Sequence, residues 1–280
     1  MTRYLVLDVF TDTPFGGNPL AVIPEAGALP EASLQKIARE FNFSETVFLY
    51  PPQDAAHTAR MRIFTPTLEI PFAGHPTIGA AVALAHSGHG PDMMLELGVG
   101  PLAARATRTR ASFDTSVPLD VLAAPQPALV ARALGLPESA LKLSTHAPAL
   151  ASVGLPFTLT ELASRDALAA CAPDSAAFRE GAARHEGALD FAQFAYVREG
   201  STIHARMFAP LDNIPEDPAT GSACAALGAF LASLHGTAQN LTVHQGYDMG
   251  RPSQIGLSAQ DGTVTISGAA VQTMQGDLTI

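Results

Sequence analysis

One extended pattern occurs twice in this sequence, and this repeat limits the possible folds more than any other feature. The first copy begins at Ala59 (ARMRIFTPTLEIPFAGHPTIGAAVALAHSG) and the second at His204 (HARMFAPLDNIPEDPATGSACAALGAFLASLHG). Each copy has an arginine-containing strand that ends in Phe-x-Pro, a loop with Ile-Pro, and a small-residue loop that leads into an alanine-rich helix. A pattern this long that occurs only twice does not build a solenoid. It predicts two similar lobes that face each other.

The first half of the chain reads as alternating strands with two helices. The segment LPEASLQKIAREFN, residues 29–42, predicts an amphipathic helix with Leu34, Ile37, Ala38 and Phe41 on one face. A second helix is predicted from Pro76 to about Ser87, ended by Gly88. Strands are predicted over residues 4–10, 45–50, 59–66, 94–97 and 102–107, and another follows the glycine-rich turn of residues 14–23.

The second half begins near Thr115, so the predicted lobes cover residues 1–114 and 115–268. Helices are predicted over residues 127–137 and 159–173, and a third begins near Thr220. The segments LASVG (150–154) and FAQFAYV (191–197) read as strands.

Composition excludes several classes of protein. The chain has 280 residues, of which 47% are hydrophobic and 15% are charged, which is enough material for one large domain or two ordinary ones. The net charge of −10 argues against a nucleic-acid partner. The two cysteines have no metal-type or CxxC spacing, so neither a disulfide framework nor a metal site is predicted.

The hydropathy pattern gives no sign of a membrane or export segment. No apolar run of about 18 residues is present, so no membrane partner is expected. The N-terminal MTRYLVLDVF resembles a strand and not a signal peptide, and a cytoplasmic location is therefore expected.

The two helix starts predict a binding site for an anion. One is Gly74-His75-Pro76-Thr77, and the other runs from Asp217 through Thr220 and Gly221 to Ser222. Helix N-termini bind carboxylates and phosphates through backbone N–H groups, and glycine lets a ligand approach the backbone closely. If a pseudo-twofold axis relates the lobes, both helix starts face one cleft and hold a small carboxylate substrate.

Three side chains near these helix starts are candidates for proton transfer. Glu45, in NFSETVF, lies among apolar residues that favour an uncharged carboxyl group, although an exposed glutamate is the simpler interpretation. His75 titrates near neutrality by type, but a capping or surface histidine is also possible. Asp217 is equally suited to an N-cap. Together the three supply a base, an acid and nearby amides, which suffice to move a proton on a carboxylic acid.

Four segments resemble the PhzF-like family of phenazine-biosynthesis proteins: FTDTPFGGNPLAVI, NFSETVFL, RIFTPTLEIPFAGHPTIGA and EDPATGSA. They occur in the family's order and span the chain. The resemblance implies an α+β, diaminopimelate-epimerase-like fold of two pseudo-symmetric lobes, each a mixed β-sheet wrapped round a central helix. It also implies that the last strand, about residues 269–280, returns to the N-terminal lobe.

The resemblance assigns roles to individual residues. Glu45 in the SET motif matches the family's general acid/base, and His75 and Asp217 match the residues that accompany it. Gly74, Gly221 and Ser222 match positions that hold the substrate carboxylate and amine. The best-known activity of the family is isomerisation of trans-2,3-dihydro-3-hydroxyanthranilate without cofactor or metal. The expected function is therefore a cofactor-independent isomerase that moves a proton on a small cyclic amino or hydroxy carboxylate.

Two alternatives remain open at this point. One is a racemase or lyase on another small amino or hydroxy acid, with Glu45 and His75 as its two bases. The other is a non-catalytic carboxylate-binding protein. A two-thiol epimerase is disfavoured, because enzymes of this fold that use two thiols carry one at each helix start, and Cys224 lies about a turn too deep. Arg62 and Arg206 are expected to pair with acidic side chains.

The resemblance also predicts a homodimer. Sedimentation velocity at micromolar concentration is expected to show a species of twice the 29.1 kDa chain mass. A single species at the mass of one chain would contradict this prediction.

Overall fold

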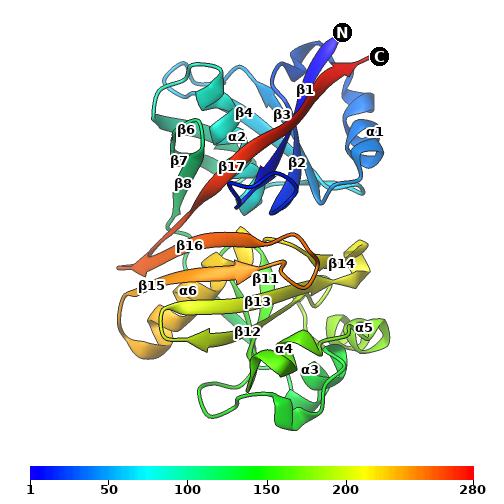
Figure 1. Cartoon of the computed structure of the whole chain (residues 1–280), viewed down its shortest axis with the longest axis vertical. Helices are drawn as coiled ribbons and strands as arrows, with labels where there is room; N and C mark the ends of the chain where they lie inside the picture. The colour runs from blue at the N-terminus through cyan, green and yellow to red at the C-terminus, as the bar shows by residue number, and fades with distance from the viewer. The chain divides into compact units, whose positions relative to one another are not determined.

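The computed structural model describes all residues from Met1 to Ile280, and they form two compact units (Figure 1). The first unit contains residues 1–115 and 265–280, and the second contains residues 116–264. The boundaries predicted above, after residues 114 and 268, differ from these by one and four residues.

The first unit is built on a mixed sheet. Strand β1 (Thr2–Val9) is antiparallel to β2 (Asn18–Ile23), and β2 is parallel to β3 (Glu45–Tyr50). The order then continues through β4 (Ala59–Phe64), β6 (Asp92–Leu97), β7 (Gly100–Ala106) and β8 (Arg110–Thr115), with the short β5 (Glu69–Ile70) beside β4. Strand β17 (Thr263–Leu278) pairs with both β8 and β1, which brings the two termini together (Figure 1).

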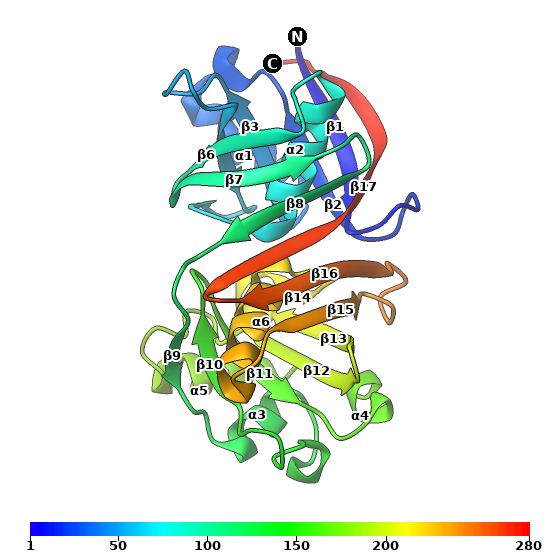
Figure 2. The ribbon, with the colours of Figure 1, turned by 90° about the vertical axis from the view of Figure 1, so that its left-hand side faces the viewer.

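Helix α2 (Gly74–His86) is surrounded by this sheet (Figure 2). Every residue from Gly74 to Ala85 is buried, and the helix packs on β1, β2, β3, β7 and β8. A helix enclosed in this way needs small side chains all round, which explains its alanines and its lack of an amphipathic pattern. Helix α1 (Glu31–Phe41) instead lies outside the sheet. It buries Leu34, Ile37 and Ala38, with Phe41 packed beside them, which confirms the predicted face.

The strands of the second unit also pair in both parallel and antiparallel senses. Its strands are β9 (Asp120–Ala123), β10 (Ala149–Ser152), β11 (Pro156–Glu161), β12 (Gln193–Glu199), β13 (Thr202–Ala209), β15 (Gln239–Gln245) and β16 (Ser253–Gln260), with β14 (Ile214–Asp217) beside β13. The buried helix here is α6 (Gly221–His235). Three shorter helices, α3 (Pro127–Ala133), α4 (Arg165–Ala169) and α5 (Ser175–Arg184), share an apolar cluster with Leu150, Phe191 and Phe208.

The repeated sequence corresponds to a repeated order of strands and helices. In the first unit β4, β5 and α2 are followed by β6 and β7, and in the second β13, β14 and α6 are followed by β15 and β16. The pairing senses also agree, because β4 is parallel to β6 as β13 is to β15, and both following pairs are antiparallel. The two buried helices are therefore equivalent elements.

Two of the predicted boundaries were wrong. The predicted helix over residues 159–173 is mostly not helical, because Leu159, Thr160 and Glu161 belong to β11 and pair with β12. The helix α4 in this segment starts only after Ser164, whose side chain accepts a hydrogen bond from the amide of Ala167. Helix α2 starts two residues earlier than predicted, so Pro76 is its third residue. Separately, none of the helices has the length and apolar character needed to cross a membrane.

Two neighbouring aspartates in the second unit couple its stability to pH. The carboxyl groups of Asp190 and Asp212 are close enough to affect each other's titration. Burial, followed by the nearby Asp212 charge, raises the pKa of Asp190 to about 7. In the unfolded chain an aspartate titrates near 4. The folded state therefore holds a proton that the unfolded state releases, and this stabilisation is lost as pH rises from about 4 to 7.

Asp190→Asn is expected to remove this loss, because asparagine resembles the protonated acid and still donates a hydrogen bond. The variant should be more stable than the native protein at pH 8 by about 1–2 kcal/mol, with the difference vanishing near pH 4. Urea unfolding at several pH values measures it, with the exposed Asp277→Asn as control. A pH-independent difference between variant and native protein would contradict the prediction.

Candidate functional site

Three polar side chains of the first unit meet where three elements begin. Asn18 is the first residue of β2, Glu45 is the first of β3, and His75 is the second of α2. Strands β2 and β3 are parallel, with Leu20 opposite Glu45, so both strands start at the same edge of the sheet. The N-terminus of the enclosed helix α2 opens at that edge.

The imidazole of His75 touches both neighbours through one nitrogen. Its Nδ1 lies 3.4 Å from the Nδ2 atom of Asn18 and 3.4 Å from the Oε2 atom of Glu45. Asn18 is fully buried and His75 is 4% exposed, whereas the side chain of Glu45 remains 14% exposed. The other ring nitrogen of His75, Nε2, is buried and has no hydrogen-bond partner within the protein. Glu45 is thus the member of this group that solvent or a substrate reaches.

Burial keeps His75 uncharged. Removal from water lowers the pKa of His75 to about 3, because the charged imidazolium loses its hydration. The positive end of the α2 dipole also disfavours a cation at this position. The contact with Glu45 is therefore one between a neutral imidazole and a carboxyl group at neutral pH, and His75 acts as a hydrogen-bonding group and not as a counter-ion.

Glycine is required immediately before Asn18. Gly17 has φ +55°, and a β-carbon there would collide with the carbonyl oxygen of Val9. The same loop is held by Asp8, whose buried carboxylate accepts a hydrogen bond of 2.7 Å from the amide of Phe15. Gly17, in the turn predicted from the sequence, therefore helps to place Asn18 beside His75.

The second unit has a different polar group at the equivalent helix start. Asp217 ends β14 and is buried, and its Oδ2 accepts a 2.6 Å hydrogen bond from the hydroxyl of Thr220. The N-cap of α6 is Thr220, so Asp217 is not the N-cap that its sequence context also allowed. Gly221 and Ser222 are the first two residues of α6, and both are buried.

Two residues that the sequence did not indicate hold this second group in place. The amide of Gln245 donates to the carbonyl of Asp217 (2.8 Å) and to the hydroxyl of Thr220 (2.9 Å), and its oxygen accepts from the Thr220 backbone N–H (3.1 Å). The hydroxyl of Ser253 lies 2.7 Å from the carbonyl oxygen of Pro218. Gln245 and Ser253 belong to β15 and β16, so only strand pairing brings them to the loop before α6.

The structure thus brings the predicted residues together in two groups. Glu45, His75 and Gly74 meet in the first unit, and Asp217, Thr220, Gly221 and Ser222 meet in the second. The expectation that both helix starts face one cleft stays a prediction. Asn18 was missed, although the Gly-Gly-Asn sequence of the first turn contained a signal for it.

Cys224 and the two repeated arginines, Arg62 and Arg206, have structural roles. Cys224 is fully buried, and burial raises the pKa of its thiol far above neutrality, so it is no nucleophile. Arg62 pairs with Glu31 and Glu69, and Arg206 pairs with Glu216, as predicted. No three His, Cys, Asp or Glu side chains cluster in an arrangement that could hold a metal ion.

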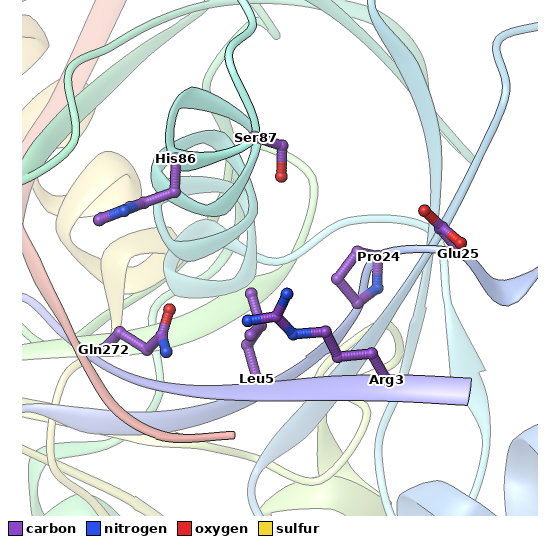
Figure 3. A pocket seen from close by; sticks show the side chains of 7 residues that line it. All are labelled: Arg3, Leu5, Pro24, Glu25, His86, Ser87 and Gln272. Atoms are coloured by element: carbon purple, nitrogen blue, oxygen red, sulfur yellow. The ribbon is translucent and has the colours of Figure 1, made fainter. Parts of the chain in front are cut away.

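A cavity of about 400 Å³ in the first unit contains none of the candidate residues (Figure 3). Its lining includes Arg3, Glu25, His86 and Gln272. His86 is the last residue of α2, eleven residues after His75, which places it about 16 Å further along the helix. This cavity is therefore separate from the Glu45–His75 group.

Comparison with known proteins identifies the family. The profile of the phenazine biosynthesis-like proteins, PhzC-PhzF, matches residues 7–276. The chain belongs to this family. A protein of Mesorhizobium japonicum named as an uncharacterized isomerase is 40% identical, with 99% of each chain covered. The trans-2,3-dihydro-3-hydroxyanthranilate isomerase of Pseudomonas fluorescens is 35% identical, with 100% of each chain covered.

Solved structures agree with this assignment. The structure described as a predicted epimerase from Pseudomonas aeruginosa superimposes with a TM-score of 0.85 and 32% identity over 100% of both chains. A probable proline racemase from Agrobacterium radiobacter has a TM-score of 0.68 at 12% identity, covering 100% of this chain and 93% of its own. At that identity the likeness concerns the fold alone. This chain is therefore an α+β protein with mixed sheets, as predicted.

The loop before α6 depends on a second glycine, which yields a stability prediction. Gly246 has φ +77°, and a β-carbon there would collide with the carbonyl oxygens of Arg251 and Pro218. Gly250 has φ +69° in open space. Gly250→Ala should cost about 1 kcal/mol for its backbone alone, and Gly246→Ala about 3 kcal/mol because two backbone groups must also move. Urea unfolding measures both, and equal losses would contradict the prediction.

Proposed function

We propose that this isomerase of the phenazine biosynthesis-like family moves a proton between two atoms of a small cyclic amino or hydroxy carboxylate, with Glu45 as its general acid/base. Of the three polar side chains that meet in the first unit, Asn18 and His75 are buried and Glu45 is partly exposed. Proton transfer by one carboxyl group, aided by hydrogen-bond donors, needs neither a metal nor an organic cofactor. The name of the Pseudomonas fluorescens relative supports trans-2,3-dihydro-3-hydroxyanthranilate as the first substrate to test.

The contact between Glu45 and His75 is the observation that carries this proposal. Nδ1 of His75 and Oε2 of Glu45 are 3.4 Å apart, which supports an approach of both groups to a bound substrate from one side. A single carboxyl group that removes a proton and returns it on the same side catalyses an isomerisation. A racemase with Glu45 and His75 as its two bases would need them on opposite faces of one carbon atom, and this pair does not supply that geometry.

In the proposed reaction, a carboxylate oxygen of Glu45 takes a proton from one ring carbon and delivers it to another. His75, uncharged because it is buried, contributes a hydrogen bond. The first-turn amides of α2, beginning at Gly74, lack acceptors within the helix and suit the substrate carboxylate. We assign Asp217 to the second acid–base position, and Thr220, Gly221 and Ser222 to substrate binding at the start of α6.

The broader expectations are also part of the proposal. The repeated order of elements supports the two-lobed, pseudo-symmetric architecture expected from the sequence. We further propose that the protein acts as a cytoplasmic homodimer on a small carboxylate, without nucleic-acid or membrane partners.

Incubation in deuterated water tests the proposal. The panel contains trans-2,3-dihydro-3-hydroxyanthranilate and simple amino acids, and NMR follows deuterium incorporation and conversion. Glu45→Gln is expected to lower the rate about 10²- to 10⁴-fold, because the amide cannot accept the proton. The exposed Glu40→Gln on α1 is the matched control and should retain full activity.

The outcomes separate the alternatives. Isomerised product that depends on Glu45 supports the proposal. Exchange with inversion at a single carbon would favour the racemase instead. Carboxylate binding that survives Glu45→Gln, with no substrate consumed, would favour a binding protein and would overturn the enzymatic assignment.

A further inference from the structure

The side chain of Asn18 contacts the His75 ring, whose Nε2 atom is buried without a hydrogen-bond partner. A neutral imidazole has one N–H donor and one lone-pair acceptor, on different nitrogens. The nitrogen of the Asn18 side chain faces Nδ1 of His75 at 3.4 Å, and an amide nitrogen can only donate. If Asn18 donates to Nδ1, then Nδ1 is the acceptor and the ring proton lies on Nε2.

We propose that Asn18 is a positioning residue that holds His75 as the Nε2–H tautomer, so that His75 offers an N–H donor to an oxygen atom of the substrate. This inference rests on the proposed function, since it names what His75 does in the same site. It adds a role for Asn18 and a position for the ring proton, neither of which the family resemblance assigned.

The state of Nε2 supports the assignment to a ligand. This atom is buried and makes no hydrogen bond to the protein. A buried donor without a partner loses its hydration without compensation, so proteins retain one where a ligand or a water molecule satisfies it. Oxygen acceptors are present in any substrate with a carboxylate or hydroxyl group. A bound substrate of the proposed class would therefore satisfy the Nε2–H group.

The same tautomer also affects Glu45. Oε2 of Glu45 lies 3.4 Å from Nδ1, which carries a lone pair when Asn18 donates to it. A carboxylate oxygen that faces a lone pair receives no hydrogen bond from the imidazole. In this tautomer His75 therefore does not compete with the substrate proton for the Glu45 carboxylate.

Two features of the fold hold Asn18 in this position. Its backbone is paired with Val9 in the β1–β2 ladder, and Gly17 before it adopts a conformation that only glycine adopts without collision. The side chain is completely buried. Its amide group consequently has little freedom to turn away from the imidazole.

The position of the ring proton can be measured directly. Protein labelled with ¹⁵N-histidine gives long-range ¹H–¹⁵N correlations that distinguish a protonated ring nitrogen from an unprotonated one. The chain has nine histidines, and His75 is assigned as the set of signals missing from His75→Asn. The native protein is expected to show protonated Nε2 and unprotonated Nδ1 for His75 at neutral pH. A proton on Nδ1 would overturn the proposal without recourse to any variant of Asn18.

The variant Asn18→Asp tests the cause. A carboxylate only accepts, so it should move the ring proton of His75 to Nδ1 and lower kcat by about 10²-fold or more. Asn240→Asp, at an exposed position on β15, is the control and should change neither the tautomer nor kcat. An unchanged tautomer in Asn18→Asp, or a moved proton with unchanged kcat, would overturn the role of Asn18.

Failure of the proposed function is distinguishable from failure of this inference. The native protein could show the Nε2–H tautomer and Asn18→Asp could move the ring proton, while the native protein catalyses no proton exchange. These results would support the control of His75 by Asn18. They would at the same time overturn the isomerase mechanism, since the tautomer is read from the free protein and activity is read from the substrate.

Discussion

The enclosure of helix α2 within a sheet is the constraint on which the rest of the first unit depends. A helix buried on all sides must carry small side chains, and its first turn lies inside the protein and not in water. His75 lies in that first turn and is consequently stripped of solvent, which keeps it uncharged. The uncharged state of His75 thus follows from the burial of the alanine-rich helix that carries it.

The second unit solves the same structural problem with different residues. Its enclosed helix α6 also begins with a small-residue loop, but there a hydrogen-bonded set of Asp217, Thr220 and Gln245 replaces the imidazole. The two copies of the repeat therefore share the arrangement of strand, loop and helix, while the side chains at the two helix starts differ. Two equivalent backbone arrangements thus carry two chemically distinct polar groups.

Sequence reasoning recovered most elements because their patterns are local. The face of α1, the strands β3 and β4, and the start of α6 follow from periodicity and from glycine and proline signals. It failed in residues 159–173, where Leu159 to Glu161 have a helix-compatible composition but are drawn into β11 by pairing with β12. Pairing between distant strands overrides local preference, and no local pattern reports it.

The sequence by itself determined the repeated architecture, the family and the candidates Glu45, His75 and Asp217, since these depend on residue types in a fixed order. Only the tertiary structure decided which groups touch. The parallel pairing of β2 and β3 puts Asn18 and Glu45 at one edge beside His75, and the pairing of β13 and β15 brings Gln245 to the loop before α6. Contacts of this kind arise from strand register over long separations in the chain, and they set protonation and orientation, which residue type alone leaves open.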